Sequence, residues 1–258
     1  MEWFFAFDEN ASDWFSDMIK VAVISAMATK RLEPHCLYDG KPNALTKWLS
    51  TNGVTVHPCE VPFKAELSSP EVLQRNEGTH YTASHAAGAF LRTSASSFAK
   101  GHTFAYTDCD VMFLDGRIAD QHSDSFHAVP EHTGSSFNSG VMLINKWFWK
   151  AHYDGLVGYI RENGFYCREH SSYDQVLLNR YFAGQWGPLP SDFNWRPFQG
   201  LSMMASIVHF HGPKPHRINA ILKKEALPEE ANLVDLINRD RDAYAHYLSK
   251  FGENLSLA

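Results

Sequence analysis

The fold is indicated most clearly by one stretch near the middle of the chain, His102-Thr103-Phe104-Ala105-Tyr106-Thr107-Asp108-Cys109-Asp110-Val111-Met112-Phe113-Leu114. Residues 102–107 have the pattern of a strand, and Asp108 and Asp110 follow it at once. In an extended backbone, residues i and i+2 point to the same face. Two carboxylates on one face repel each other unless a cation lies between them. Because ligands of open α/β sheets gather at the carboxyl ends of strands, the stretch predicts an α/β fold with a site for a hard divalent cation.

Outward from this stretch, short apolar runs alternate with helical patterns, which is typical of a βαβ layout. Strands are predicted at 3–7, 36–38, 54–57, 141–144 and 207–210, and helices at 12–29, 44–51, 81–98, 146–163 and 173–182. Residues 116–135 are polar and rich in glycine, serine and histidine, so they are predicted to form a loop. One or two charged helices are predicted at 229–251. Without a clear linker or repeat, this pattern favours one domain with a C-terminal helical appendage.

The composition limits the classes of protein to consider. Of 258 residues, 44% are hydrophobic and 20% charged, as in a globular protein with a substantial core. The net charge of -6 leaves no basic surplus to neutralise a nucleic-acid backbone, although a local pocket for one diphosphate is allowed. The first ten residues lack the basic region of a signal peptide, and no apolar run approaches the roughly 20 residues of a spanning helix.

We therefore expect a cytoplasmic protein with no transmembrane segment and no nucleic-acid partner. The four cysteines, Cys36, Cys59, Cys109 and Cys167, lie far apart in sequence and form no C-x-x-C pair. We expect them to be reduced, because a chain of this length does not need disulfides to be stable. The oligomeric state is not indicated by the sequence.

The pattern Asp-x-Asp occurs twice, and its context separates the two copies. Asp240-Arg241-Asp242 lies in a charged, helix-like stretch with no preceding strand. In a helix, residues i and i+2 do not face each other, so this copy is predicted to be a solvated helix face. Asp108 and Asp110 follow a strand, but a plain polar turn is an alternative for them too.

A second group of candidate residues lies in Ile207-Val208-His209-Phe210-His211-Gly212-Pro213-Lys214-Pro215-His216. A histidine offers a neutral third metal ligand, a glycine lets backbone N–H groups approach an anion, and a lysine supplies a point charge for phosphate. A lone histidine is more often structural than a ligand. Together with the two aspartates, however, His209 is the predicted third ligand, and His211 is the alternative.

Six short motifs follow one another along the chain. They are Ala6-Phe7-Asp8-Glu9-Asn10, Gly88-Ala89-Phe90-Leu91-Arg92, Tyr106-Thr107-Asp108-Cys109-Asp110-Val111, Phe137-Asn138-Ser139-Gly140-Val141-Met142-Leu143-Ile144-Asn145, Tyr173-Asp174-Gln175-Val176-Leu177-Leu178-Asn179 and His209 to Lys214. In these motifs and their order, most of residues 3–216 resembles the retaining glycosyltransferases of family 8, which include glycogenin and the bacterial lipopolysaccharide α-galactosyltransferases. Two departures are visible. The closing motif is one residue shorter before Lys214, and His216 replaces the usual tryptophan.

The resemblance implies a GT-A fold, which is a Rossmann-like mixed sheet flanked by helices. It implies a glycosyltransferase domain at 1–216, with a nucleotide-binding half at about 1–115 and an acceptor half at about 116–216, followed by a C-terminal helical extension at 217–258. The donor would be a UDP-sugar, UDP-glucose or UDP-galactose above all, with Mn2+ or Mg2+ as cofactor. The acceptor would be a glycan or another hydroxyl compound, and no motif recognised in 116–135 identifies it.

The residue roles also follow from the resemblance. It assigns Asp108, Asp110 and His209 to the metal; Ala6, Asp8, Asn10, Arg92, Cys109, Gly212 and Lys214 to the nucleotide; and Asn138, Ser139, Asp174 and Gln175 to the donor sugar, with Gln175 and Asp174 as the catalytic pair. Simpler alternatives stand beside two of these assignments and one neighbouring run. Asp174 has the residue type of a helix N-cap and Asn138 that of a turn residue. The run Trp147-Phe148-Trp149 is predicted to pack in the core rather than to stack on an acceptor sugar.

Two other functions use some of the same features. A metal-dependent nucleotidyltransferase or phosphohydrolase also places paired aspartates after a strand, but it has no need of Phe137–Asn145 or of Asp174 and Gln175. A non-catalytic sugar-nucleotide-binding module is the other alternative. The complete set Asp108, Asp110 and His209 favours an enzyme.

Overall fold

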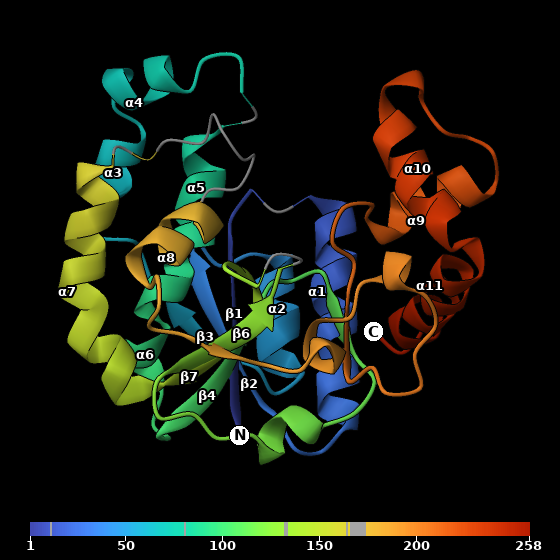
Figure 1. Ribbon diagram of the computed structural model, residues 1–258, viewed down its shortest axis with the longest axis horizontal. Helices are drawn as coiled ribbons and strands as arrows, with labels where there is room; N and C mark the ends of the chain where they lie inside the picture. The colour runs from blue at the N-terminus through green and yellow to red at the C-terminus, as the bar shows by residue number, and fades with distance from the viewer. Residues whose placement is uncertain (11, 80, 132–133, 164, 166–173) are drawn as a thin grey trace. The chain divides into compact units, whose positions relative to one another are not determined.

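The computed structural model describes residues 1–10, 12–79, 81–131, 134–163, 165 and 174–258 (Figure 1). The chain divides into two compact units, each built from three separate segments. The first unit comprises Met1–Ala11, Glu33–Asp108 and Gln121–Leu189, and the second comprises Ser12–Leu32, Cys109–Asp120 and Pro190–Ala258. The predicted halves at about 1–115 and 116–216, and the extension at 217–258, refer to binding roles. The two compact units are not defined by what they bind, so the division into a nucleotide-binding half and an acceptor half stays a prediction.

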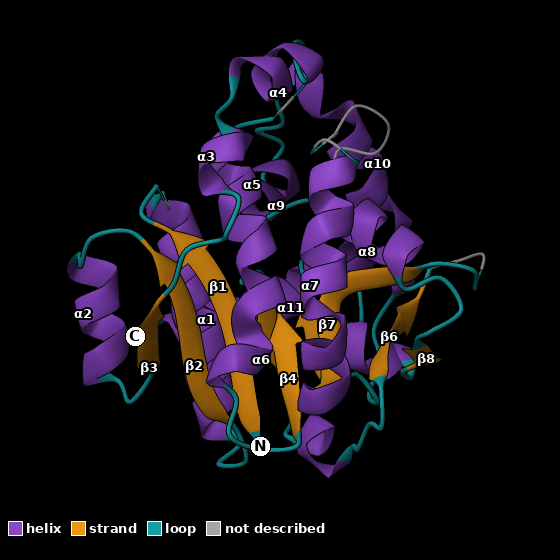
Figure 2. Cartoon of the chain, turned by 90° about the vertical axis from the view of Figure 1, so that its left-hand side faces the viewer, coloured by secondary structure: helices purple, strands orange, loops and turns teal. Residues whose placement is uncertain are grey.

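The first unit contains a seven-stranded mixed sheet in the order β3-β2-β1-β4-β7-β6-β8. In chain order its strands are β1 (Glu2–Asp8), β2 (Glu33–Asp39), β3 (Thr55–Pro58), β4 (Thr103–Thr107), β6 (Phe126–Pro130), β7 (Phe137–Asn145) and β8 (Gly187–Pro188). β3, β2, β1 and β4 are parallel, whereas β7 is antiparallel to β4 and β6 is antiparallel to β7. Figure 2 shows these strands in orange. The carboxyl ends of β1, β2 and β4 therefore lie at the same edge of the sheet.

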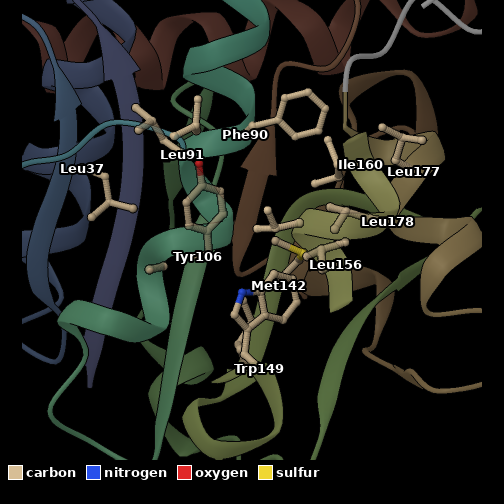
Figure 3. Packing of buried hydrophobic residues seen from close by; sticks show 14 of the residues in the cluster. Leu37, Phe90, Leu91, Tyr106, Met142, Trp149, Leu156, Ile160, Leu177 and Leu178 are labelled. Carbon is tan, nitrogen blue, oxygen red and sulfur yellow. The ribbon is translucent and has the colours of Figure 1, made fainter. Parts of the chain in front are cut away.

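The helices of the first unit cover strands that are apolar along their length, as expected for a sheet buried on both faces. They are α2 (Ala44–Thr51), α3 (Lys64–Leu67), α4 (Pro70–Arg75), α5 (Ala83–Phe90), α6 (Ala95–Phe98), α7 (Lys146–Glu162) and α8 (Gln175–Tyr181), with a 3-10 turn at Leu91–Ser94. Figure 3 shows Met142 of β7 packed near Leu156 of α7 and Leu178 of α8. This apolar core fixes α8 beside β7, so that the first residue of α8, Gln175, faces the start of β7.

The second unit has a two-stranded sheet and its own core. Its elements are α1 (Asp13–Ala28), β5 (Val111–Phe113), β9 (Ile207–His209), α9 (Pro215–Leu222), α10 (Ala231–Arg239) and α11 (Arg241–Leu255), with 3-10 turns at Arg117–Asp120, Ser191–Asn194, Pro197–Gln199 and Pro228–Glu230. β5 and β9 are antiparallel, and Val111 pairs with His209. Buried side chains from α1, β5, β9 and α11 form one cluster, including Val21, Met112, Val208 and Tyr244.

Most predicted elements are confirmed, and the exceptions have physical reasons. The helix predicted at 81–98 is confirmed from Ala83 to Phe98, but its middle tightens into the 3-10 turn that carries the buried Arg92. The loop predicted at 116–135 is wrong at Phe126–Pro130, which pairs with β7 as β6 and buries Phe126 and Ala128. Helix α9 was not predicted; Pro215 occupies its first turn, where proline is well tolerated.

Two smaller expectations can also be compared with the structure. The helix predicted at 173–182 begins at Gln175, and Tyr173 lies outside the described residues. In the second Asp-x-Asp copy, Asp240 is not part of a solvated helix face, because its Oδ1 accepts a hydrogen bond from the backbone N of Ala243 at 2.9 Å and caps α11.

The structure bears on the predictions about membrane spans and disulfides only within the described residues. Within those ranges, none of the helices combines the length and the apolarity that a bilayer crossing requires. No disulfide joins any two of Cys36, Cys59 and Cys109, and Cys167 lies outside the described ranges. The cytoplasmic location stays a prediction.

The contact between the buried His35 of β2 and the partly buried His57 of β3 leads to a prediction about stability. His35 Nδ1 lies 3.0 Å from His57 Nε2, and burial lowers the pKa of both histidines. As pH falls below about 6.5, the unfolded chain takes up protons that the folded chain resists, so the free energy of unfolding decreases. We expect His35→Gln to reduce this loss between pH 7 and pH 5 by on the order of 1 kcal/mol, measured by urea unfolding.

The matched control is His246→Gln, which removes an exposed histidine of α11. It should leave the pH dependence of the wild-type chain unchanged. Equal pH dependence in wild type and His35→Gln would show that the histidine pair is not responsible.

Candidate functional site

The pairing of β5 with β9 brings His209 beside Asp110 within the second unit. His209 Nε2 lies 3.2 Å from Asp110 Oδ1, and both side chains are at least nine-tenths buried. The backbone N of Phe210 donates to the carbonyl O of Asp110 at 2.9 Å, which fixes the strand end against the turn. The local backbone geometry therefore holds this acid and this histidine together.

Asp108 precedes Asp110 by two residues, at the carboxyl end of β4. One possible ligand atom from each of Asp108, Asp110 and His209 lies within 4.8 Å of the others. The structure thus brings the three predicted metal ligands together. His211, the alternative ligand, is exposed and is not part of this group among the described residues.

The chemistry of these donors fits a divalent cation. His209 Nδ1 lies 2.8 Å from Asn194 Oδ1, which can only accept, so the proton is on Nδ1. Nε2, the nitrogen that faces Asp110, is then the atom whose lone pair would serve a bound cation. A ligating histidine usually donates its other N–H to a polar partner in this way. Two carboxylates and one imidazole suit Mn2+ or another first-row divalent ion and leave positions for further oxygen ligands.

Asp110 is also paired with Lys214, whose Nζ lies 2.5 Å from Asp110 Oδ2. Burial on its own would raise the pKa of Asp110, but the positive charge of Lys214 and the contact with His209 outweigh it and hold that pKa far below its usual range. Asp110 is therefore ionised at neutral pH. The predicted phosphate-binding lysine and the predicted metal ligand are in direct contact.

In the first unit, Arg92 is buried and joins two carboxylates. Its Nη2 donates to Asp108 Oδ1 at 2.6 Å, and its Nε lies 2.7 Å from Asp174 Oδ2. Burial on its own would lower the pKa of Arg92, but the charges of Asp174 and Asp108 raise it above its ordinary value. Nη1 donates to the carbonyl O of Ser139 at 2.7 Å, and Nε donates to that of Ala89 at 3.0 Å. All three guanidinium nitrogens are therefore used inside the protein.

Asp174 lies at the start of α8 but does not act as a capping side chain. It occupies the N-cap position, yet its side chain makes no capping hydrogen bond. The carboxylate is buried, and burial raises its pKa although the charge of Arg92 opposes the change. The geometry thus favours a role for Asp174 in the charged network over the helix-cap alternative.

The side chain of Gln175 faces the start of β7. Its Oε1 accepts hydrogen bonds from Asn138 Nδ2 at 3.0 Å and from the backbone N of Ser139 at 3.1 Å. Asn179, one turn further along α8, accepts from the backbone N of Phe137 at 2.7 Å and donates to its carbonyl O at 2.8 Å. The four residues predicted to face a donor sugar, Asn138, Ser139, Asp174 and Gln175, therefore converge between β7 and the start of α8.

The N-terminal candidates lie at the carboxyl end of β1. Asp8 Oδ1 accepts from the backbone N of Asn10 at 2.7 Å, and Ala6 is partly buried in the strand. A Cβ added to Gly88 would lie 3.0 Å from Asp8 Oδ2, so this glycine leaves room for the carboxylate. Phe4 pairs with Tyr106 in the parallel register, so Ala6 and Asp8 lie toward the same edge of the sheet as Asp108.

The remaining candidates have structural explanations as well. Gly212 has φ = 88°, a left-handed conformation that favours glycine and turns the chain between β9 and Lys214. The side chain of Cys109 is buried, which agrees with a contribution through the backbone. Trp149 packs in the core as predicted, but Trp147 is 57% exposed. Because Thr103 pairs with Asn145, Trp147 follows β7 at the end of the sheet away from Asp108.

Sequence reasoning missed Asn194 as a partner of His209 and gave no role to Asn179. Asn179 ends a recognised motif, so its spacing from Gln175 was a usable signal. Asn194 lies in a 3-10 turn and belongs to no motif. Its contact with His209 depends on pairing between segments distant in sequence, and no local pattern could have revealed it.

No protein-family model matches the sequence, and a comparison with curated proteins finds no match. Among solved structures, galactosyltransferase LgtC in complex with donor and acceptor sugar analogues is 19% identical with a TM-score of 0.67, covering 99% of this chain and 95% of its own. Glycosyltransferase GlyE of Streptococcus pneumoniae TIGR4, in its apo form, is 17% identical with a TM-score of 0.55, covering 96% of this chain and 63% of its own. Mouse xyloside xylosyltransferase 1, also in apo form, is 13% identical with a TM-score of 0.53, covering 82% and 97%. At these identities the likeness establishes the fold, and the predicted GT-A fold is confirmed.

Proposed function

We propose that this chain is a metal-dependent glycosyltransferase that transfers a hexose from a UDP-sugar to a hydroxyl group of a glycan or similar acceptor, with retention of the anomeric configuration. The observation that carries the proposal is the group formed by Asp108, Asp110 and His209 at the end of β4, in a fold shared with three sugar transferases. The donor and acceptor sugar analogues in the LgtC structure support this substrate class.

The proposed reaction breaks the bond between the anomeric carbon and a phosphate oxygen, and it forms a bond from that carbon to the acceptor oxygen. The acceptor proton passes to the departing UDP. The transition state resembles an oxocarbenium ion, as in glycosidases, and negative charge builds up on the diphosphate. Mn2+, or Mg2+ in its place, would supply Lewis-acid stabilisation of that charge when bound. Asp108, Asp110 and His209 are the side chains that would hold it.

The nucleotide would be bound by residues at the edge shared by β1 and β4. Asp8 and Asn10 would contact the uracil and ribose, with Ala6 and the backbone of Cys109 alongside them. Gly212 and Lys214 would approach the diphosphate. The fixed contact between Asp8 and the Asn10 backbone supports the first assignment, because it leaves Asp8 Oδ2 for a donor group of the ligand.

The donor sugar would lie against Asn138, Ser139, Asp174 and Gln175. The Oε1 of Gln175 already accepts hydrogen bonds from Asn138 and Ser139, so it is poorly suited to attack a carbon. This favours attack by the acceptor on the same face from which UDP departs. Arg92 would act mainly by holding Asp108 and Asp174, because each of its three guanidinium nitrogens already has a partner within the chain.

The decisive experiment is a screen of UDP-sugars for release of UDP, with Mn2+ and with a chelator, in the presence of candidate acceptors. A nucleotidyltransferase or phosphohydrolase would release UMP or sugar phosphate instead. A binding module would bind the donor without turnover across the panel. The products therefore separate the three functions.

Replacement of Asp110 tests the metal assignment. We expect Asp110→Ala to abolish Mn2+-dependent release of UDP while the circular dichroism spectrum stays that of a folded chain, because one of three predicted ligands is lost. Asp242→Ala is the control, since Asp242 is the exposed acid of the second Asp-x-Asp copy. Turnover that survives Asp110→Ala would show that the metal assignment is wrong.

Asn194 tests whether His209 needs its buried partner. Asn194→Ala removes the acceptor at Nδ1, so we expect the affinity for Mn2+ to fall by about 10- to 100-fold, measured by calorimetry without substrate. Asn194→Asp keeps an acceptor and should retain most of the affinity. Equal Mn2+ affinity in wild type and Asn194→Ala would contradict a ligand role for His209.

Gln175 tests the placement of the donor sugar. We expect Gln175→Ala to lower kcat by about 10- to 100-fold with little change in UDP affinity, because misplacement of a reacting group is costly whereas the nucleotide contacts remain. UDP affinity is measured by calorimetry and kcat by UDP release. A variant that keeps full kcat would remove Gln175 from the reaction centre.

A further inference from the structure

Lys214 contacts Asp110, one of the three predicted metal ligands, although the sequence predicts that it binds a phosphate. Its Nζ contacts Asp110 Oδ2 at 2.5 Å and donates to the carbonyl O of Phe210 at 3.2 Å. The Lys214 side chain is 29% exposed and that of Asp110 is 10% exposed. The ammonium group thus neutralises a buried acid and remains within reach of solvent.

The backbone holds the lysine in this place. Gly212, at φ = 88°, turns the chain directly after β9, and Lys214 forms the N-cap of α9. Helix α9 is anchored in the core of the second unit by Ile218 and Ile221. Only Gly212 and Pro213 separate His211 from Lys214. The Cα of Lys214 is therefore held close to the end of β9, which carries His209.

This arrangement has an electrostatic consequence for a cation. The charges of Asp110 and Lys214 cancel each other within the pair. Without Lys214, the carboxylate of Asp110 would attract a divalent cation. With the ammonium group of Lys214 in contact with that carboxylate, a cation that binds alone is repelled by a positive charge in a poorly hydrated site. A diphosphate removes the obstacle, because its oxygens offer the ammonium group a new anionic partner.

We propose that Lys214 is the resident counter-ion of Asp110, that it disfavours binding of a divalent cation alone, and that it moves to the diphosphate when a nucleotide binds. Cation and nucleoside diphosphate then bind with positive coupling that originates partly in this exchange. The inference rests on the proposed function and adds an order to it: the nucleotide, or nucleotide and cation together, precedes the cation alone.

The test measures binding of Mn2+ to the full chain by calorimetry or by the electron paramagnetic resonance of free Mn2+, with and without UDP and without turnover. We expect Lys214→Met to bind Mn2+ alone about tenfold more tightly than wild type, within the range of ordinary coupling between ligands. The factor by which UDP increases Mn2+ affinity should fall correspondingly. Lys214→Arg keeps the charge and should bind Mn2+ alone as wild type does.

A matched control separates the contact from the net charge. Lys223→Met removes the same charge from an exposed position at the other end of α9 and should leave Mn2+ affinity unchanged. Circular dichroism checks folding, and Lys214→Gln is the replacement should Lys214→Met not fold. The wild-type chain gives an independent reading, because its Mn2+ affinity must rise when UDP is present.

The outcomes are distinct. Unchanged or weaker binding of Mn2+ alone by both Lys214→Met and Lys214→Gln would overturn the exchange and leave the proposed function standing, as would a wild-type Mn2+ affinity that UDP does not raise. If the wild-type chain binds neither Mn2+ nor UDP, the proposed function fails and the exchange fails with it.

Discussion

The candidate site depends on one antiparallel pairing, that of Val111 in β5 with His209 in β9. Asp110 directly precedes β5, so this pairing places the imidazole of His209 beside the carboxylate of Asp110, although the two residues are far apart in the sequence. The hydrogen bond from the Phe210 backbone to the Asp110 carbonyl closes the arrangement. Without that register, His209 would be an ordinary strand histidine, and Asp108 and Asp110 would be a polar turn.

A second constraint is the cost of burying charge. Asp108, Asp174 and Arg92 lie together in the first unit, and the buried guanidinium is tolerated only because two carboxylates and two backbone carbonyls surround it. The same contacts orient the two acids. Arg92 is therefore shared by the two carboxylates and fixes the direction of both before any ligand binds.

The sequence was sufficient where the signal is local. The strand at 102–107, the acids after it and the helix at 146–163 are set by neighbours within a few residues, and the structure confirms them. The role of Asn194 and the pairing of His209 with Val111 depend on contacts between distant segments, which periodicity does not encode. Strand β6 was missed because its few apolar residues lie among polar ones, and its place comes from pairing with β7.

The C-terminal helices have a consequence for any shortened form of this chain. Tyr244 and Tyr247 of α11 share a cluster with Met112 and Val208, the residues just behind the metal group on β5 and β9. In a fragment that stopped at residue 216, the apolar side chains of β5 and β9 that pack against α11 would be exposed to water. Such a fragment would keep every proposed ligand in its sequence and still lose the support that gives the ligands their positions.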